Sequence, residues 1–151
     1  MRAQGIAYDE KRQVLYIARE AYPIAVYIMH IDSTFTDFTN SPPSHRARSA
    51  LLPLTRLTPP YPDDEDWRYW LRDISDLHYD QESDTLLVLS DESNTIIQVN
   101  VTSGVVIDAL RFSHKLDQPE ALVMLPGGHE IFVFGENNEF SLLSLSFLAF
   151  K

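Results

Sequence analysis

The feature that most constrains this chain is a threefold internal repeat, because a repeat of this kind decides which architecture can bury a core. Three segments align without gaps, at residues 4–20, 75–91 and 120–136. Each begins with a short strand pattern, continues through a polar turn, and ends in an apolar run followed by a carboxylate. The apolar runs are too short for a typical helix and lack its 3.6-residue period, so each unit is predicted to contain a β-hairpin.

Additional strand patterns follow each hairpin. They occupy residues 25–29, 95–99 and 140–145, and the second unit has a fourth strand pattern at 105–110. Four strands in about 45 residues are typical of one β-propeller blade. We therefore predict a single all-β domain over residues 1–151, propeller-like, with about three four-stranded antiparallel blades. The predicted blade units are 4–32, 73–112 and 117–147.

A proline-rich stretch separates the first two units. Six of the nine prolines fall between residues 34 and 72. Because proline cannot donate to a sheet ladder, we predict an insertion loop outside the blades. Within it, Trp67, Tyr69 and Trp70 either pack the loop onto the blades or bind a protein partner.

Composition excludes several kinds of function. The chain has 12 basic and 22 acidic residues and a net charge of −10, which disfavours nucleic acids and anionic membrane surfaces as partners. It has no cysteine, so thiolate metal sites and cysteine nucleophiles are excluded. No apolar run reaches the length of a membrane span, and no GxSxG, Walker or GxGxxG motif occurs. These observations favour a protein that is not an enzyme.

The best chemical candidates are acidic residues at repeat positions. Glu20, Asp91 and Glu136 follow the apolar strands, and Glu120 and Asp73 lie near blade starts. If the units are blades, the first three share one rim of the propeller and the last two lie near another. Carboxylates converging on a propeller axis suit calcium, a hard cation with oxygen ligands. Alternatively, they accept hydrogen bonds from turn amides and stay solvated.

The repeats also resemble a known family. Residues 73–80 and 86–93, the latter ending in Ser-Asp-Glu-Ser, are similar to the SdiA-regulated (YjiK-like) family of bacterial β-propeller proteins, as are residues 4–9, 15–20 and 117–121. Where that family opens a blade with Glu-Gly, this chain has Gln4-Gly5, Ser75-Asp76 and Glu120-Ala121. The resemblance implies a propeller fold and a location in the bacterial cell envelope or periplasm.

Three functions are compatible with these patterns. The preferred one is a binding or scaffold module of the SdiA-regulated type with no catalytic role. The second is a calcium-dependent hydrolase of an ester or phosphoester, in which the metal would polarise the substrate and activate water. The third is an interaction module that uses the loop around Trp67 and Trp70.

Three blades are too few for a closed ring, since propellers typically have 4–8 blades. The apolar strands at 15–18, 86–89 and 131–134 are continuous, which predicts that each blade has neighbours on both faces. We therefore expect the chain to be a homo-oligomer, simplest as two copies that make six blades, or part of a longer propeller.

Overall fold

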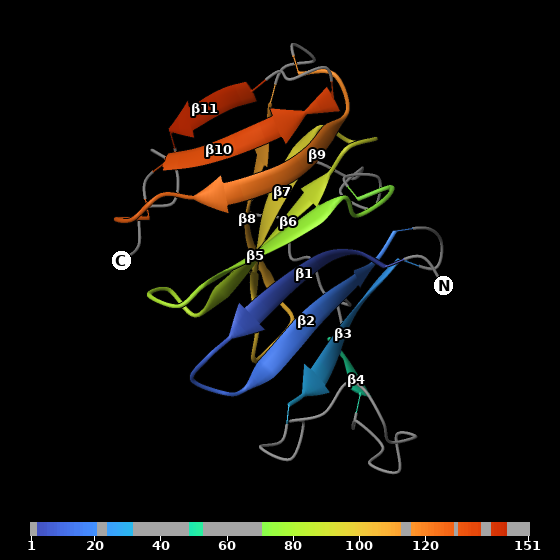
Figure 1. Ribbon diagram of the computed structural model, residues 1–151, viewed down its shortest axis with the longest axis vertical. Helices are drawn as coiled ribbons and strands as arrows, with labels where there is room; N and C mark the ends of the chain where they lie inside the picture. The colour runs from blue at the N-terminus through green and yellow to red at the C-terminus, as the bar shows by residue number, and fades with distance from the viewer. Residues whose placement is uncertain are drawn as a thin grey trace, which may run out of the picture.

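The computed structural model describes residues 3–20, 24–31, 49–52, 71–112, 116–128, 130–136 and 140–144. Over these ranges the chain forms three antiparallel sheets and no α-helix (Figure 1). Blade 1 contains β1 (Ala3–Asp9), β2 (Val14–Arg19), β3 (Ala25–His30) and β4 (Ser49–Leu52). Blade 2 contains β5 (Asp76–Asp80), β6 (Thr85–Ser90), β7 (Thr95–Asn100) and β8 (Val106–Arg111). Blade 3 contains β9 (Pro119–Met124), β10 (Glu130–Gly135) and β11 (Phe140–Ser144).

The first hairpins of blades 1 and 2 use the same turn chemistry, as the repeat predicts. Asp9 and Asp80 stand at equivalent positions, where each first strand ends. Asp9 Oδ1 accepts a hydrogen bond from the amide of Arg12 at 2.9 Å, and Asp80 Oδ1 accepts one from the amide of Glu82 at 3.0 Å. These aspartates close the turns by pairing amides that the strands leave free.

One prediction about the insertion is wrong. Residues 34–72 were expected to lie outside the blades, but Ser49–Leu52 is the fourth strand of blade 1. It pairs with β3 through Val26↔Leu52 and Met29↔Ser49. The strand is only four residues long and Pro53 follows it directly, so it carries too little pattern to be recognised. Trp67, Tyr69 and Trp70 lie outside the described residues.

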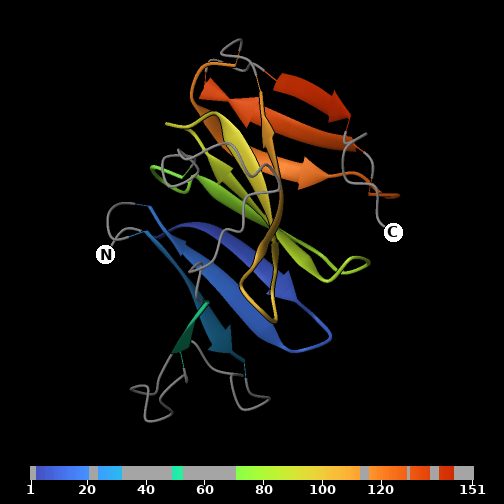
Figure 2. The same cartoon turned by 180° about the vertical axis from the view of Figure 1, so that it is seen from behind.

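The three sheets stack as propeller blades. β1, β5 and β9 each form one edge of their sheet and are neighbours in space (Figure 1; Figure 2 gives the reverse view). One hydrophobic core lies between blades 1 and 2, with Val14, Tyr16 and Val88 among its members. A second core between blades 2 and 3 includes Leu89 and Ile131. The predicted all-β, propeller-like arrangement is therefore confirmed, with β1, β5 and β9 along its axis.

Blade 2 is covered on both sides and the outer blades are not. Every residue of β6 is buried, as the continuous apolar run predicts for a strand between two neighbouring blades. In contrast, β2 alternates between buried and partly exposed residues, and in β10 the buried residues also alternate with more exposed ones. Blades 1 and 3 thus each bury one face within the part of the chain that is described.

Candidate functional site

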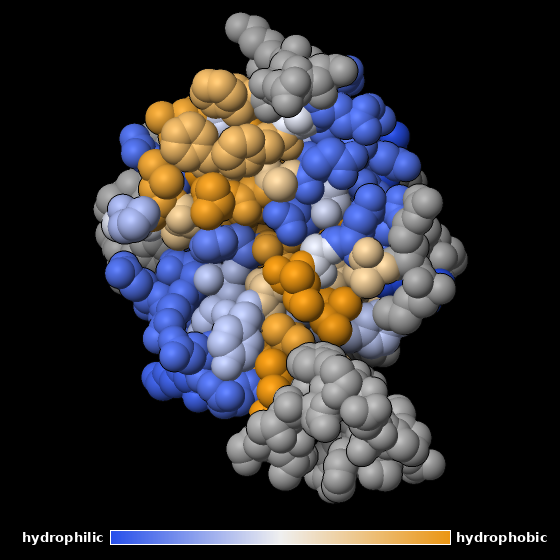
Figure 3. Space-filling model, in the orientation of Figure 1, coloured by the Kyte–Doolittle hydropathy of each residue, from blue (hydrophilic) through white to orange (hydrophobic). Residues whose placement is uncertain are grey.

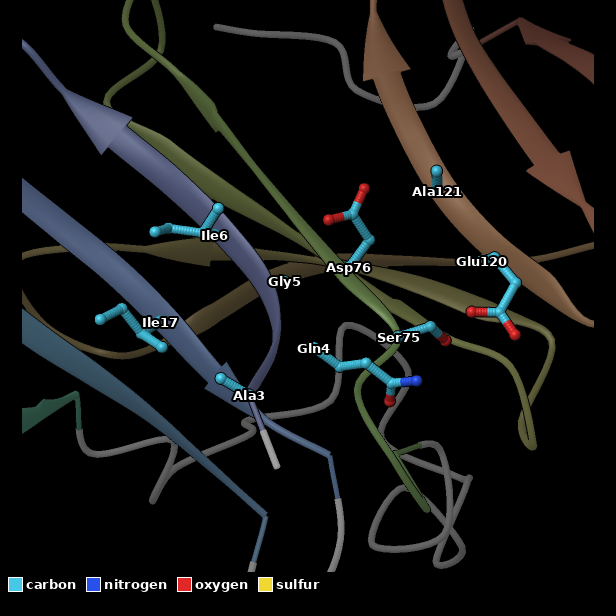
Figure 4. A pocket seen from close by; sticks show the side chains of 9 residues that line it. All are labelled: Ala3, Gln4, Gly5, Ile6, Ile17, Ser75, Asp76, Glu120 and Ala121. Atoms are coloured by element: carbon cyan, nitrogen blue, oxygen red, sulfur yellow. The ribbon is translucent and has the colours of Figure 1, made fainter. Parts of the chain in front are cut away.

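An open pocket of about 480 Å³ lies where the three inner strands begin. It is lined by the three residue pairs that open the repeat units: Gln4-Gly5, Ser75-Asp76 and Glu120-Ala121. Ala3, Ile6 and Ile17 complete the lining. Figure 4 shows these residues at the same end of β1, β5 and β9. The repeat alignment thus predicts which positions meet at the mouth of the axis.

Gly5 brings β1 into backbone contact with β5 at this pocket. A Cβ atom placed on Gly5 would lie 2.9 Å from the Cα atom of Asp76 and 2.9 Å from the backbone nitrogen of Leu77. Real Cβ atoms essentially never come so close to backbone. Glycine is therefore the residue that permits this approach between blades 1 and 2.

Asp76 occupies the position in blade 2 that Gly5 occupies in blade 1, and its side chain binds the next blade. Its Oδ2 atom accepts a hydrogen bond from the amide of Leu122 at 2.9 Å, which ties β5 to β9 of the next blade. The carboxylate lies between these strands (Figure 4). Burial raises the pKa of Asp76, although the amides of Leu122 and Leu77 act in the opposite direction. The pocket therefore has a carboxylate whose negative charge is incompletely stabilised.

The Ser-Asp-Glu-Ser segment at residues 90–93 is organised beside this pocket. Asp73 Oδ1 accepts hydrogen bonds from Ser90 Oγ at 2.6 Å and from the amide of Glu92 at 3.1 Å. Ser75 Oγ accepts one from the amide of Asp91 at 2.9 Å. These contacts fix the turn between β6 and β7 against the start of β5.

Asp73 and Glu120 lie close enough to Asp91 for their charges to act on it. Burial raises the pKa of Asp91, and the negative charges of Asp73 and Glu120 raise it further. The expectation that Asp91 occupies a different rim from Asp73 and Glu120 is therefore wrong. The reason is antiparallel pairing: β6 ends where β5 begins, so acids at these two places share one end of the blade.

Glu20 and Glu136 follow β2 and β10 at positions equivalent to Asp91. Among the residues that the structure describes, no three His, Cys, Asp or Glu side chains could together hold a metal ion. Of the five acids proposed as calcium ligands, Asp73 and Glu120 act on Asp91, and the described residues contain no group of these side chains that could hold a metal ion.

The sequence-based search for a site missed Gln4, Ser75 and Asp76. Their signal was present, since they align with Glu120 and Ala121 at the start of the repeat units. The three units carry different side chains at these positions, so no recurring charged residue marks them.

Comparison with known proteins agrees with the fold. The family model described as SdiA-regulated matches residues 3–144. The crystal structure of a nidogen/laminin complex contains a similar chain, with a TM-score of 0.60 and 12% sequence identity. The match covers 94% of this chain and 44% of that chain, so this chain spans less than half the length of its structural relative. At this identity, the likeness concerns the β-propeller fold alone.

Within the described ranges, no helix has the length and apolar character needed to cross a membrane.

Proposed function

This chain belongs to the SdiA-regulated family, and we propose that it is a non-catalytic binding module whose pocket at the mouth of the axis accepts a cationic group. The observation that carries the proposal is the lining of that pocket. Its nine residues include the carboxylates of Asp76 and Glu120 and no basic side chain. Ligand pockets of a few hundred Å³ suit small molecules or single side chains, so we propose an alkylammonium or guanidinium group as the ligand.

The electrostatics beside the pocket support this choice. Burial raises the pKa of both Asp76 and Asp91, and at Asp91 the charges of Asp73 and Glu120 add to the effect. A positive charge placed among these carboxylates would stabilise their ionised forms. A ligand of this kind would therefore bind less well in acid, where the carboxylates become protonated.

The proposal predicts selective binding of Nα-acetyl-L-argininamide over Nα-acetyl-L-citrullinamide, which has nearly the same shape and carries no charge; the two probes are called argininamide and citrullinamide below. We expect argininamide at millimolar concentrations, typical of a contact worth about 4 kcal/mol, to shift the backbone amide NMR signals of Gln4, Ser75 and Asp76. Replacing Glu120→Gln should weaken this binding about fivefold, as expected for about 1 kcal/mol of lost charge interaction.

Glu130→Gln is the matched control. Glu130 is an exposed carboxylate on the same blade, at the start of β10. Gly135, which pairs with Pro119 at the start of β9, lies at the other end of that strand. It should leave the affinity for argininamide unchanged. Equal shifts with citrullinamide, or equal losses in both glutamate variants, would contradict the proposed pocket.

Calcium is the second candidate ligand on the sequence pattern alone, since Asp73, Asp91 and Glu120, all described residues, do not form a group that could together hold a metal ion. If the site is specific for organic cations, millimolar calcium chloride should leave the melting temperature unchanged. A ligand that binds only the folded state raises that temperature. A rise with calcium that disappears when Glu120→Gln and Asp91→Asn are combined would instead favour a metal site, and with it the calcium-dependent hydrolase.

A further inference from the structure

Blade 3 presents an exposed apolar face, which we call the blade 3 open face. Its rings are in contact: the centroids of Phe132 and Phe134 lie 6.1 Å apart, and those of Phe132 and Phe140 lie 6.4 Å apart. Strand pairing places Phe132 between Val123 and Leu142 on the same side of the sheet. The face therefore consists of Val123, Phe132, Phe134, Phe140 and Leu142.

The equivalent face is buried in the other two blades. Phe134 aligns with Ala18 of blade 1 and Leu89 of blade 2. Phe134 is 44% exposed, whereas Ala18 and Leu89 are both 0% exposed. Ala18 belongs to the core between blades 1 and 2, and Leu89 to the core between blades 2 and 3. In blades 1 and 2 this face packs on the next blade along the chain. In blade 3 the same face is open.

Blade 1 presents the complementary half of the same interface. Its exposed apolar residues Ile6 and Tyr8 pair with Ile17 and Leu15 of β2, and these four residues define the blade 1 open face. Ile6, at 60% exposure, aligns with Leu77 and Leu122, at 4% and 6%. Leu77 faces blade 1 and Leu122 faces blade 2. Blade 1 therefore leaves open the face that packs on a preceding blade.

Both open faces are visible from the side on which β1, β5 and β9 lie. Figure 3 shows one apolar area over β10 and β11 and another over β1 and β2. Apolar surfaces of this kind on a soluble chain mark an interface. Because the two faces are the two halves of one repeated blade-to-blade contact, each can serve as the partner of the other.

We propose that two copies of this chain close a six-bladed ring, in which blade 3 of each copy packs on blade 1 of the other. The number of copies follows from the number of blades in a closed ring. Propellers typically have 4–8 blades, and six is the only multiple of three in that range. Two identical contacts related by a two-fold axis then cover all four open faces. The second copy would also bring its own β1, β5 and β9 to the axis, so the pocket would gain its missing side. The association follows from packing and does not depend on what the pocket binds.

Light scattering after size exclusion tests the number of copies. At micromolar concentration, the protein should have twice the 17.3 kDa mass of one chain. A well-folded monomer, or a series of species growing with concentration, would overturn the closed dimer. The first outcome would mean that the open faces are tolerated in water, and the second that the chains join without closing a ring.

Two charged substitutions test which faces meet. Phe134→Glu on blade 3 and Tyr8→Lys on blade 1 should each give monomers, because each places a charge in both contacts of a homodimer. Both side chains are exposed in the single chain, so the variants should fold; if Phe134→Glu lowers the melting temperature, Phe140→Glu takes its place. Ile107→Lys, an exposed apolar position on β8 of blade 2, is the control and should remain dimeric.

An equimolar mixture of the two variants provides the sharpest result. In the proposed ring, one contact of the mixed dimer is native, and the other brings the introduced glutamate of one chain against the introduced lysine of its partner. These two charges are opposite, so the mixture should form dimers although neither variant does alone. Dimerisation of the Tyr8→Lys variant by itself would indicate that blade 3 packs on blade 3, and failure of the mixture to associate would also overturn the proposal.

Discussion

Replacing Gly5→Ala should lower the free energy of unfolding by about 3 kcal/mol, the cost of overpacking where the structure cannot yield. The added Cβ atom would meet only backbone, 2.9 Å from the Cα atom of Asp76 and from the nitrogen of Leu77. No side chain can rotate away from it. To make room, β1 would have to separate from β5, which would open the contact between blades 1 and 2 at the pocket.

Gly128→Ala is the matched control for this prediction. Gly128 has a positive φ of 69°, but the nearest atom to its Cβ position is the sulfur of Met124 at 3.8 Å. Alanine there costs only the strain of a Cβ atom in the left-handed backbone conformation, about 1 kcal/mol. Urea unfolding of both variants measures the difference. A loss at Gly5 no larger than the loss at Gly128 would show that the two blades can move apart at little cost, and would contradict the prediction.

The fold was largely predictable because propeller blades repeat. Residues that align in the three units, such as Gln4, Ser75 and Glu120, occupy equivalent places at the axis, so one alignment predicts strands, register and neighbours together. The exception is β4, which lies far from β3 along the chain and is too short to show a period. A strand of this kind is defined by its partner, here β3, more than by its own residues.

The chemistry of the site was less predictable, because equivalent positions carry different side chains. Gly5 allows backbone contact, whereas Asp76 reaches across to the amide of Leu122. A repeat predicts where these residues lie but not which interaction each one makes. The grouping of Asp73 with Asp91 also depends on strand pairing, which places the start of β5 beside the end of β6.

Arg12 illustrates a residue that the sequence alone gives no reason to select. It lies in the polar turn between β1 and β2, yet its guanidinium joins blade 1 to blade 2. Nη1 donates to Asp9 Oδ2 at 2.8 Å, and Nη1 and Nη2 donate to the two carboxylate oxygens of Asp84 at 2.5 and 2.6 Å. Tyr79 donates its hydroxyl proton to Asp84 at 2.8 Å. This cluster forms where the two turns of neighbouring blades meet.

Asp9 depends on Arg12 because the Asp9 side chain is completely buried. Burial alone would raise the pKa of Asp9, but the hydrogen bonds and positive charge of Arg12 outweigh it, and the pKa lies below its ordinary value of 3.8. A carboxyl group whose pKa is lowered by folding stabilises the protein above its unfolded pKa, and this contribution is lost as the pH falls through the folded value. The wild-type protein should therefore lose this part of its stability below about pH 4.

Arg12→Met should lower the free energy of unfolding at pH 7 by about 3 kcal/mol, because it leaves the buried charge of Asp9 without its partner. The deficit should shrink in acid, where Asp9 takes up a proton and no longer needs a cation. Adding Asp9→Asn should recover part of the loss, since the neutral amide oxygen can still accept the backbone N–H of residue 12. Asp84→Asn is the control: Asp84 is partly exposed, and its ion pair should be worth less than about 1 kcal/mol. Urea unfolding at pH 7 and pH 4 measures the wild-type protein and the three variants. A loss in Arg12→Met that is the same at both pH values would show that the guanidinium acts through packing and not through the charge of Asp9.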